Sequence, residues 1–215
     1  MKKDFTELVF ILDKSGSMCG LEKDTIGGFN SMIEKQRKEE GEAVVTTVLF
    51  NDKVNVIHNL RDIKEVPLLT DKEYCVSGCT ALLDALGNTV NHICKIHKNM
   101  NEEELPEKTL FIITTDGLEN SSIEYTYSTL KRLIEKVKEK YKWEFIFLGA
   151  NIDASQEARR FGIDESNAVN YNCDDEGIEL NYECLSQAVS EIRRRKCLSP
   201  RWRDAIDEDI KKRKI

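Results

Sequence analysis

The chain has 215 residues, of which 40% are hydrophobic and 33% are charged, and its formal net charge is −7. This length and composition fit one compact domain with a hydrophobic core and a well-solvated surface. The acidic balance disfavours general nucleic-acid binding, which requires a basic surface. No apolar run reaches the roughly 20 residues that span a bilayer, and the N-terminal residues show no signal-peptide pattern. We therefore expect a cytoplasmic protein without a nucleic-acid or membrane partner.

The first strand is predicted from residues 8–12, an unbroken apolar run that ends in Asp13 and a Ser-Gly-Ser turn. Such a run is typical of a strand covered on both faces, usually a central strand of a parallel sheet. Apolar residues at helical spacing then predict a helix from residue 21 to about residue 40. A strand rich in Val and Thr follows at 43–50, and a strand at 54–60 is expected to run antiparallel to it after an Asn-Asp turn.

The rest of the chain alternates helices with strands after a loop at residues 61–79, which contains at most one helical turn. Further helices are predicted from residue 79 onward and over 127–141, 154–161 and 175–196, and further strands over 109–114, 145–148 and 168–171. This alternation predicts an α/β fold with a doubly wound, mostly parallel six-stranded sheet, one antiparallel edge strand and the strand order 3-2-1-4-5-6. His58, on the edge strand, is expected at the surface.

We expect residues 1–196 to form the domain and residues 197–215 to form a charged C-terminal tail that is helical or mobile. Seven cysteines are scattered along the chain, and their odd number predicts reduced thiols in a chain without an export signal. A zinc site that uses Cys75, Cys79, His92 and Cys94 is disfavoured. His92 and Cys94 are two residues apart on a predicted helix and point to different faces.

Five oxygen-bearing side chains follow the predicted strands or open a predicted helix. Asp13, Ser15 and Ser17 follow the first strand, Thr80 lies at the start of the helix after the third strand, and Asp116 follows the fourth strand. In the predicted strand order, the first and fourth strands flank the switch point at which open α/β sheets bind ligands. Two carboxylates with three hydroxyls suit Mg²⁺ or Mn²⁺ better than zinc. Each residue alone fits a helix cap or a turn, but the set together indicates a metal site.

Three segments resemble the motifs of the metal-ion-dependent adhesion site (MIDAS) in von Willebrand factor type A (VWA) domains. Residues 13–17 resemble the family's D-x-S-x-S motif, residues 78–85 its threonine segment and residues 115–117 its T-D-G segment. The motifs occur in the family's order, and the resemblance extends from about residue 5 to about residue 195. The chain is most similar to stand-alone bacterial or phage members, including those grouped with tellurite-resistance proteins. Cys79 departs from the pattern, because a glycine is common there.

The resemblance implies a VWA fold that binds magnesium, with manganese as an alternative. It implies that the ion is held by Ser15, Ser17 and Thr80, with Asp13 and Asp116 close by, directly or through water. It also implies protein binding rather than catalysis, with an Asp or Glu of a partner protein completing the metal shell. Neither the partner nor the oligomeric state follows from the sequence.

The alternative function is that of a Mg²⁺-dependent phosphotransferase or phosphatase in which Asp13 is the nucleophile. Such enzymes also place an aspartate and a magnesium ion after a first strand. The haloacid-dehalogenase pattern, however, needs a second aspartate where this chain has Ser15. A receiver-like protein would need a lysine after a late strand, and residues 144–150 contain none. We therefore expect a protein that is not an enzyme.

Overall fold

A six-stranded sheet forms the centre of the computed structural model, which describes residues 1–195 and 198–213. The strands are β1 (Lys2–Asp13), β2 (Glu42–Phe50), β3 (Val54–Asp62), β4 (Pro106–Thr115), β5 (Glu144–Gly149) and β6 (Ala168–Asn170). Their order is β3-β2-β1-β4-β5-β6, and every neighbouring pair is parallel except β2 and β3. The predicted fold class and strand order are confirmed.

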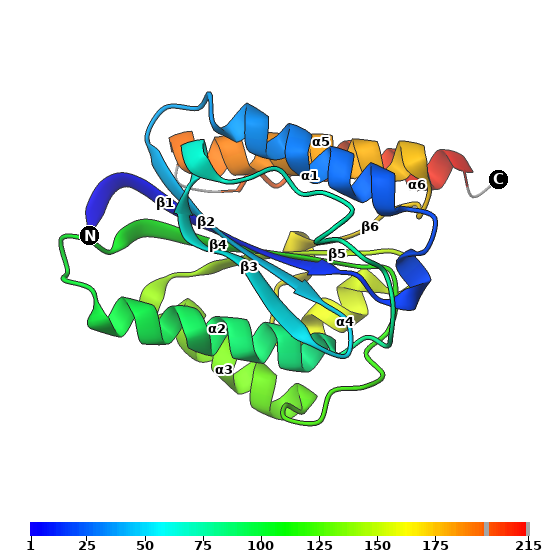
Figure 1. Cartoon of the computed structure of the whole chain (residues 1–215), viewed down its shortest axis with the longest axis horizontal. Coiled ribbons are helices and arrows are strands. Elements are labelled where there is room, and N and C mark those ends of the chain that lie inside the picture. The colour runs from blue at the N-terminus through cyan, green and yellow to red at the C-terminus, as the bar shows by residue number, and fades with distance from the viewer. Residues whose placement is uncertain (196–197, 214–215) are drawn as a thin grey trace.

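Helices cover both faces of the sheet (Figure 1). The helices are α1 (Glu22–Gln36), α2 (Leu82–Asn99), α3 (Tyr127–Tyr141), α4 (Ala154–Phe161), α5 (Asp175–Arg195) and α6 (Asp204–Arg213). Helices α1, α5 and α6 lie on one face, and α2, α3 and α4 lie on the other. Short 3-10 helices occur at Gly16–Met18, Ile63–Glu65 and Glu165–Asn167. In the part of the chain that the structure describes, no helix is long and apolar enough to cross a membrane.

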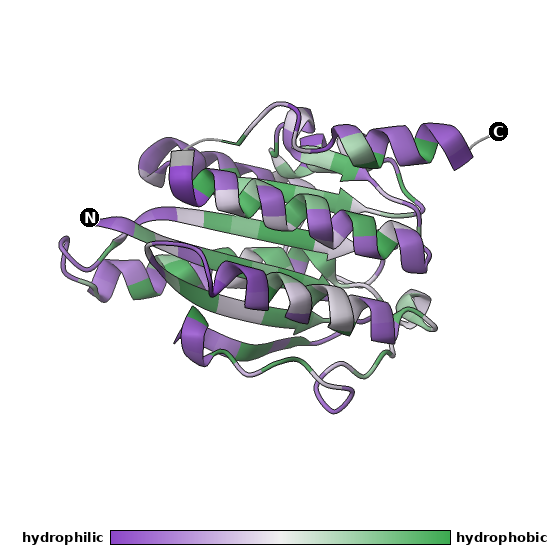
Figure 2. Ribbon diagram, turned by 90° about the horizontal axis from the view of Figure 1, so that it is seen from above, coloured by the Kyte–Doolittle hydropathy of each residue, from purple (hydrophilic) through white to green (hydrophobic). Residues whose placement is uncertain are grey.

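The apolar run of β1 explains the three-layer arrangement. Side chains of successive strand residues point to opposite faces of a sheet, and all five residues from 8 to 12 are fully buried. Leu8, Phe10 and Leu12 pack in the core cluster that includes residues of α1 and α5. Val9 and Ile11 pack in the cluster that includes residues of α2, α3 and α4. In Figure 2, which looks at the molecule from above, the strands are mostly hydrophobic and the helices in front of them carry many hydrophilic positions.

Several predicted boundaries differ from the structure. Helix α1 ends at Gln36 rather than near residue 40, and the turn into β2 contains Gly41 with φ at +84°. Helix α2 begins at Leu82, so Thr80 lies in the loop before the helix rather than at its start. His58 is buried, with its Nδ1 3.0 Å from Thr47 Oγ1 on β2, so the expectation of a surface position was wrong.

The charged C-terminal segment contains helix α6, which packs against the domain. Trp202 and Ile206 are buried in the core cluster that includes residues of α1 and α5. The Trp202 indole donates a hydrogen bond of 3.0 Å to the Ser166 carbonyl, and Arg203 donates one of 2.9 Å to the Glu165 carbonyl. These contacts fix the start of α6 beside β6.

Candidate metal centre

Asp13 ends the central strand β1 and is almost completely buried, with 1% of its surface exposed. Its Oδ1 accepts a hydrogen bond of 2.7 Å from the Ser15 backbone N–H, and its Oδ2 accepts one of 2.6 Å from the Thr115 hydroxyl. Burial raises the pKa of Asp13 from 3.8 to about 6, although the bonds from Thr115 and Ser15 oppose the rise. The Tyr74 hydroxyl donates to the Asp13 carbonyl. Both the carboxylate and the backbone of Asp13 are therefore held in place.

The other predicted residues gather beside Asp13. Ser15 Oγ lies 3.1 Å from Ser17 Oγ, and the Ser17 hydroxyl donates a hydrogen bond of 2.6 Å to Asp116 Oδ1. A Cβ atom built on Gly117 would lie 3.5 Å from Ser17 Oγ and 3.8 Å from Thr80 Oγ1. The hydroxyls of Ser17 and Thr80 thus face the same glycine from two different loops. The structure brings the predicted residues into one oxygen cluster.

Backbone hydrogen bonds join the loops that carry these residues. The Gly16 N–H donates to the Gly78 carbonyl at 3.0 Å, which joins the turn after β1 to the loop before α2. A Cβ on Gly16 would lie 3.3 Å from that carbonyl, so this close approach favours glycine. The loop after β4 bonds to Thr80 in both directions: the Asn120 N–H donates to the Thr80 carbonyl at 3.0 Å, and the Thr80 N–H donates to Asn120 Oδ1 at 2.9 Å.

The charge of the cluster fits a bound cation. Asp116 is buried like Asp13, and burial raises its pKa while the Ser17 hydroxyl opposes the rise. Within the described residues, the side-chain partners of these two carboxylates are hydroxyls, and neither carboxylate forms an ion pair. Two buried anions without a basic partner are costly unless a cation compensates them. Carboxylate and hydroxyl oxygens are ligands that Mg²⁺ and Mn²⁺ prefer.

Hydroxyl groups make up most of this donor set. Within the described ranges, no group of three or more His, Cys, Asp or Glu side chains is arranged to hold a metal ion. The cluster contains two carboxylates, and its other oxygens belong to Ser15, Ser17 and Thr80. Hydroxyls are neutral ligands, so an ion held here would keep part of its positive charge for a further ligand.

Three residues that shape the cluster are not among the predicted site residues. Thr115 fixes one oxygen of Asp13, and its place directly before Asp116 was the available signal. Tyr74 and Asn120 come from loops without periodic pattern, and nothing in the sequence links them to the strand ends. Cys173 also lies nearby: burial raises the pKa of its thiol to about 11, and the negative charge of Asp116 adds to the rise. Cys173 is therefore a neutral thiol at pH 7.

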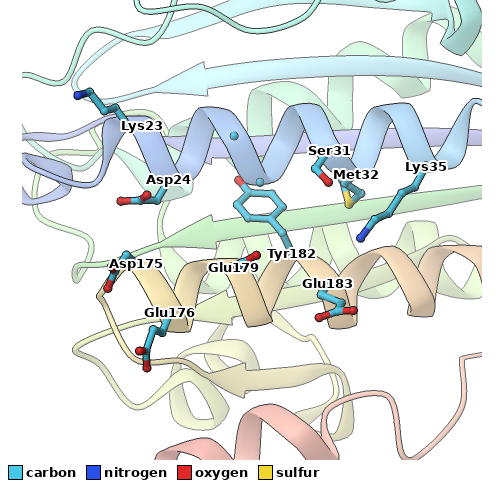
Figure 3. Close-up of a pocket in the computed structure, with 12 residues that line it drawn as sticks. Lys23, Asp24, Ser31, Met32, Lys35, Asp175, Glu176, Glu179, Tyr182 and Glu183 are labelled. Atoms are coloured by element: carbon cyan, nitrogen blue, oxygen red, sulfur yellow. The ribbon is translucent and has the colours of Figure 1, made fainter.

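A separate groove of about 480 Å³ lies between α1 and α5 (Figure 3). Most of its charged lining residues are acidic: Asp24, Asp175, Glu176, Glu179 and Glu183, against Lys23 and Lys35. The Tyr182 side chain reaches from α5 to α1, where its ring packs against Gly28. None of the oxygen-cluster residues lines this groove. Its negative charge disfavours a phosphorylated ligand there.

Solved structures with the same fold include two of proximal thread matrix protein 1 from the mussel byssus. One has a TM-score of 0.58 and the other, described as having a zinc-occupied MIDAS motif, has 0.59; each is 16% identical and matches 86% of this chain and 46% of that chain. A von Willebrand factor type A structure from Catenulispora acidiphila has a TM-score of 0.59 at 16% identity, over 86% of this chain and 42% of that one.

The chain spans less than half the length of each of these proteins. No protein-family model matches the sequence, and no curated protein matches it. At this level of identity, the likeness establishes the fold: a VWA-like α/β fold with a mostly parallel six-stranded sheet.

Proposed function

We propose that the chain is a metal-dependent protein-binding module. The ion is Mg²⁺, with Mn²⁺ as an alternative, and its site consists of Asp13, Ser15, Ser17, Thr80 and Asp116. The observation that carries the proposal is the cluster of two buried carboxylates and three hydroxyls, in which neither carboxylate has a basic partner among the described residues. A solved structure of a mussel protein with the same fold is described as having a zinc-occupied MIDAS motif, which supports metal binding by this chain.

The hydrogen bonds indicate which residues would bind the ion and which would supply negative charge. The hydroxyls of Ser15, Ser17 and Thr80 would hold the ion directly. Asp13 would contribute negative charge, because both of its oxygens already accept hydrogen bonds. Mg²⁺ in proteins usually keeps some water among its six ligands. With neutral hydroxyl ligands the ion would keep positive charge, and an Asp or Glu side chain of a partner protein would complete its ligand shell.

The geometry disfavours the alternative phosphotransferase or phosphatase. An aspartate nucleophile needs a free carboxylate oxygen that can reach the phosphorus atom. Asp13 is buried, and both oxygens are engaged by Ser15 and Thr115. We therefore infer a binding protein rather than an enzyme.

The cysteines in the described residues are free thiols, which supports our proposal of a cytoplasmic location.

The proposed coordination can be tested with Mn²⁺ as a paramagnetic probe. Water-proton relaxation of the Mn²⁺-loaded protein would be measured during titration with N-acetyl-aspartate amide. We expect enhanced relaxation on loading, followed by a saturable decrease as the carboxylate displaces water from the ion. N-acetyl-asparagine amide is the matched control, since it lacks the charge and should leave the signal unchanged. The absence of enhancement in the wild-type protein, or an equal response to both compounds, would contradict the proposal.

A further inference from the structure

The groove between α1 and α5 carries a row of carboxylates along its α5 wall (Figure 3). Asp175, Glu179 and Glu183 line the groove and follow one another at four-residue intervals. Residues four apart lie on the same face of a helix, about 6 Å apart along its axis. We call these three side chains the acidic row. Asp24 adds a fourth carboxylate from the α1 wall.

The acidic row has no basic partner in the part of the chain that the structure describes. None of its three carboxylates forms an ion pair there, and neither do Lys23 and Lys35, the two lysines that line the groove. Like charges four residues apart destabilise a helix. The helix dipole compensates Asp175, which lies in the first turn of α5, but Glu179 and Glu183 lie beyond that turn. The row is therefore costly in the free protein, and a positively charged ligand would remove this cost.

The spread of the carboxylates favours a ligand with several separate positive charges. Within residues 1–195 and 198–213, no group of three or more His, Cys, Asp or Glu side chains is arranged to hold a metal ion. The acidic row therefore does not converge on a single cation. Beside it, Arg213 of α6 forms ion pairs of 2.8 Å with Asp174 and with Glu176 at the start of α5. A guanidinium of this chain thus already binds carboxylates next to the groove.

Tyr182 gives a second, independent indication of a ligand. Its side chain lines the groove and is 5% exposed, and within the described residues its buried hydroxyl has no hydrogen-bond partner. Figure 3 shows the ring lying between α1 and α5. A buried hydroxyl without a partner is unfavourable. The N–H groups of an Arg or Lys side chain that enters the groove are donors for this hydroxyl.

The spacing of the acidic row matches an extended peptide. In an extended chain, side chains of alternate residues point to the same side and lie about 6.6–6.8 Å apart. This distance is close to the step of about 6 Å along the row. Consecutive side chains point to opposite sides, so three consecutive basic residues cannot all face the row. Gly27 leaves the α1 wall open, because a Cβ there would have no heavy atom within 4 Å, and the groove of about 480 Å³ fits a short segment.

We propose that the groove between α1 and α5 binds an extended basic segment of a partner protein, in which Arg or Lys residues occupy alternate positions. The acidic row receives these side chains, and the Tyr182 hydroxyl accepts a hydrogen bond from one of them. None of the oxygen-cluster residues lines the groove, so this binding does not use the metal ion. The proposed function at the metal centre and this second surface can therefore be tested separately.

The test uses acetylated, amidated heptapeptides and the full chain at low ionic strength, with EDTA present. The alternating peptide is Gly-Arg-Gly-Arg-Gly-Arg-Gly, and the consecutive peptide, Gly-Gly-Arg-Arg-Arg-Gly-Gly, has the same composition and charge. A third peptide has Gln in place of each Arg in the alternating one. Binding is followed by calorimetry and by backbone amide chemical shifts. We expect the alternating peptide to bind about fivefold more tightly than the consecutive one, which is the contribution of one good surface ion pair. Shifts should change in α1 and α5, and the Gln peptide should not bind.

Variants separate the groove from the overall negative charge of the protein. Glu179→Gln with Glu183→Gln should weaken binding of the alternating peptide about tenfold, the loss of two surface ion pairs, and abolish its advantage over the consecutive one. Glu135→Gln with Glu139→Gln is the matched control, because these are also exposed glutamates four residues apart, on α3 across the sheet. The control should bind both peptides as the wild type does. Thermal stability of the groove variant should not fall, since a like-charge repulsion is removed. Tyr182→Phe keeps the ring and should weaken peptide binding without destabilising the free protein.

The proposal fails if the groove is not what the peptides recognise. Equal affinity for the two Arg peptides, or an equal loss of affinity in the groove variant and the α3 control, would show only a general attraction to an acidic protein and would overturn it. Unchanged peptide affinity in Tyr182→Phe would overturn the contact assigned to the hydroxyl. Because these measurements contain EDTA, failure here leaves the metal-dependent function in place, and loss of metal binding in Asp13→Ala should leave peptide binding in the groove unchanged.

Discussion

Two adjacent glycines of α1 should respond in opposite ways to the same substitution. A Cβ on Gly27 would have no heavy atom within 4 Å, whereas a Cβ on Gly28 would lie 2.3 Å from Tyr182 Cδ2 and 2.7 Å from Cγ. Alanine is favoured over glycine in a helix interior by about 1 kcal/mol. Gly27→Ala should therefore raise the free energy of unfolding by up to about 1 kcal/mol, a shift of about 2–4 °C in Tm.

Gly28→Ala gains the same helix propensity but must displace a buried ring. The Tyr182 side chain is 5% exposed and is confined between α1 and α5, so the overlap cannot be relieved by a turn into solvent. Overpacking typically costs 1–3 kcal/mol, and this contact is severe enough to exceed the gain in propensity. We expect Gly28→Ala to be less stable than Gly27→Ala by about 2 kcal/mol or more.

Urea and thermal unfolding followed by circular dichroism would measure both variants. Truncating Tyr182 to Ala removes the ring, so the cost of Gly28→Ala should be smaller in that background, and a double-mutant cycle would give the coupling. Equal stability of the two glycine variants, or zero coupling to Tyr182, would refute this account of how α1 packs on α5.

Three further predictions concern the candidate site and its loop. Asp84→Ala removes the acceptor of three backbone N–H groups and should lower the free energy of unfolding by about 2–4 kcal/mol; unchanged amide exchange at residues 123–125 would contradict this. Tyr74→Phe removes the donor to the Asp13 carbonyl and should cost about 1 kcal/mol by urea unfolding, whereas no loss would show that this bond is dispensable. Burial raises the Asp13 pKa to about 6, so the folded protein binds this proton more tightly than the unfolded chain does. As the pH rises from about 4 to about 7, the metal-free protein should therefore lose about 3 kcal/mol of its free energy of unfolding. Asp13→Asn should lack that loss, saturating Mg²⁺ should suppress it in the wild type, and identical pH profiles for wild type and variant would contradict the assignment.

The sequence predicted the central sheet and the candidate site because both leave local signals. The run at residues 8–12 is apolar without a break, as burial on both faces requires, and Asp13 follows it directly. Asp116 follows a second such run. Because these two strands are neighbours, the side chains that follow their carboxyl ends lie close together. A correct strand order was therefore enough to predict that Asp13 and Asp116 share one site.

What the sequence could not predict depends on contacts between distant segments. Helix α1 stops at Gln36 although helix-compatible residues follow, and Arg37 just beyond it donates to the Ile63 carbonyl. His58 was expected at the surface because its strand alternates only in part, yet Thr47 provides a buried partner for the ring. The carboxylate of Asp84 fixes a loop about forty residues away in the chain. Such pairings have no local periodicity, so they appear only in the folded protein.

The most direct test of the proposed metal centre is a calorimetric titration of Mg²⁺ and Mn²⁺ into metal-free protein, with Asp13→Ala and Asp116→Ala variants alongside. We expect saturable binding of one ion by the wild type and its loss in both variants, with circular dichroism showing that both remain folded. No saturable binding by the folded wild type, or full binding by the folded variants, would contradict the central claim that this oxygen cluster holds a divalent cation.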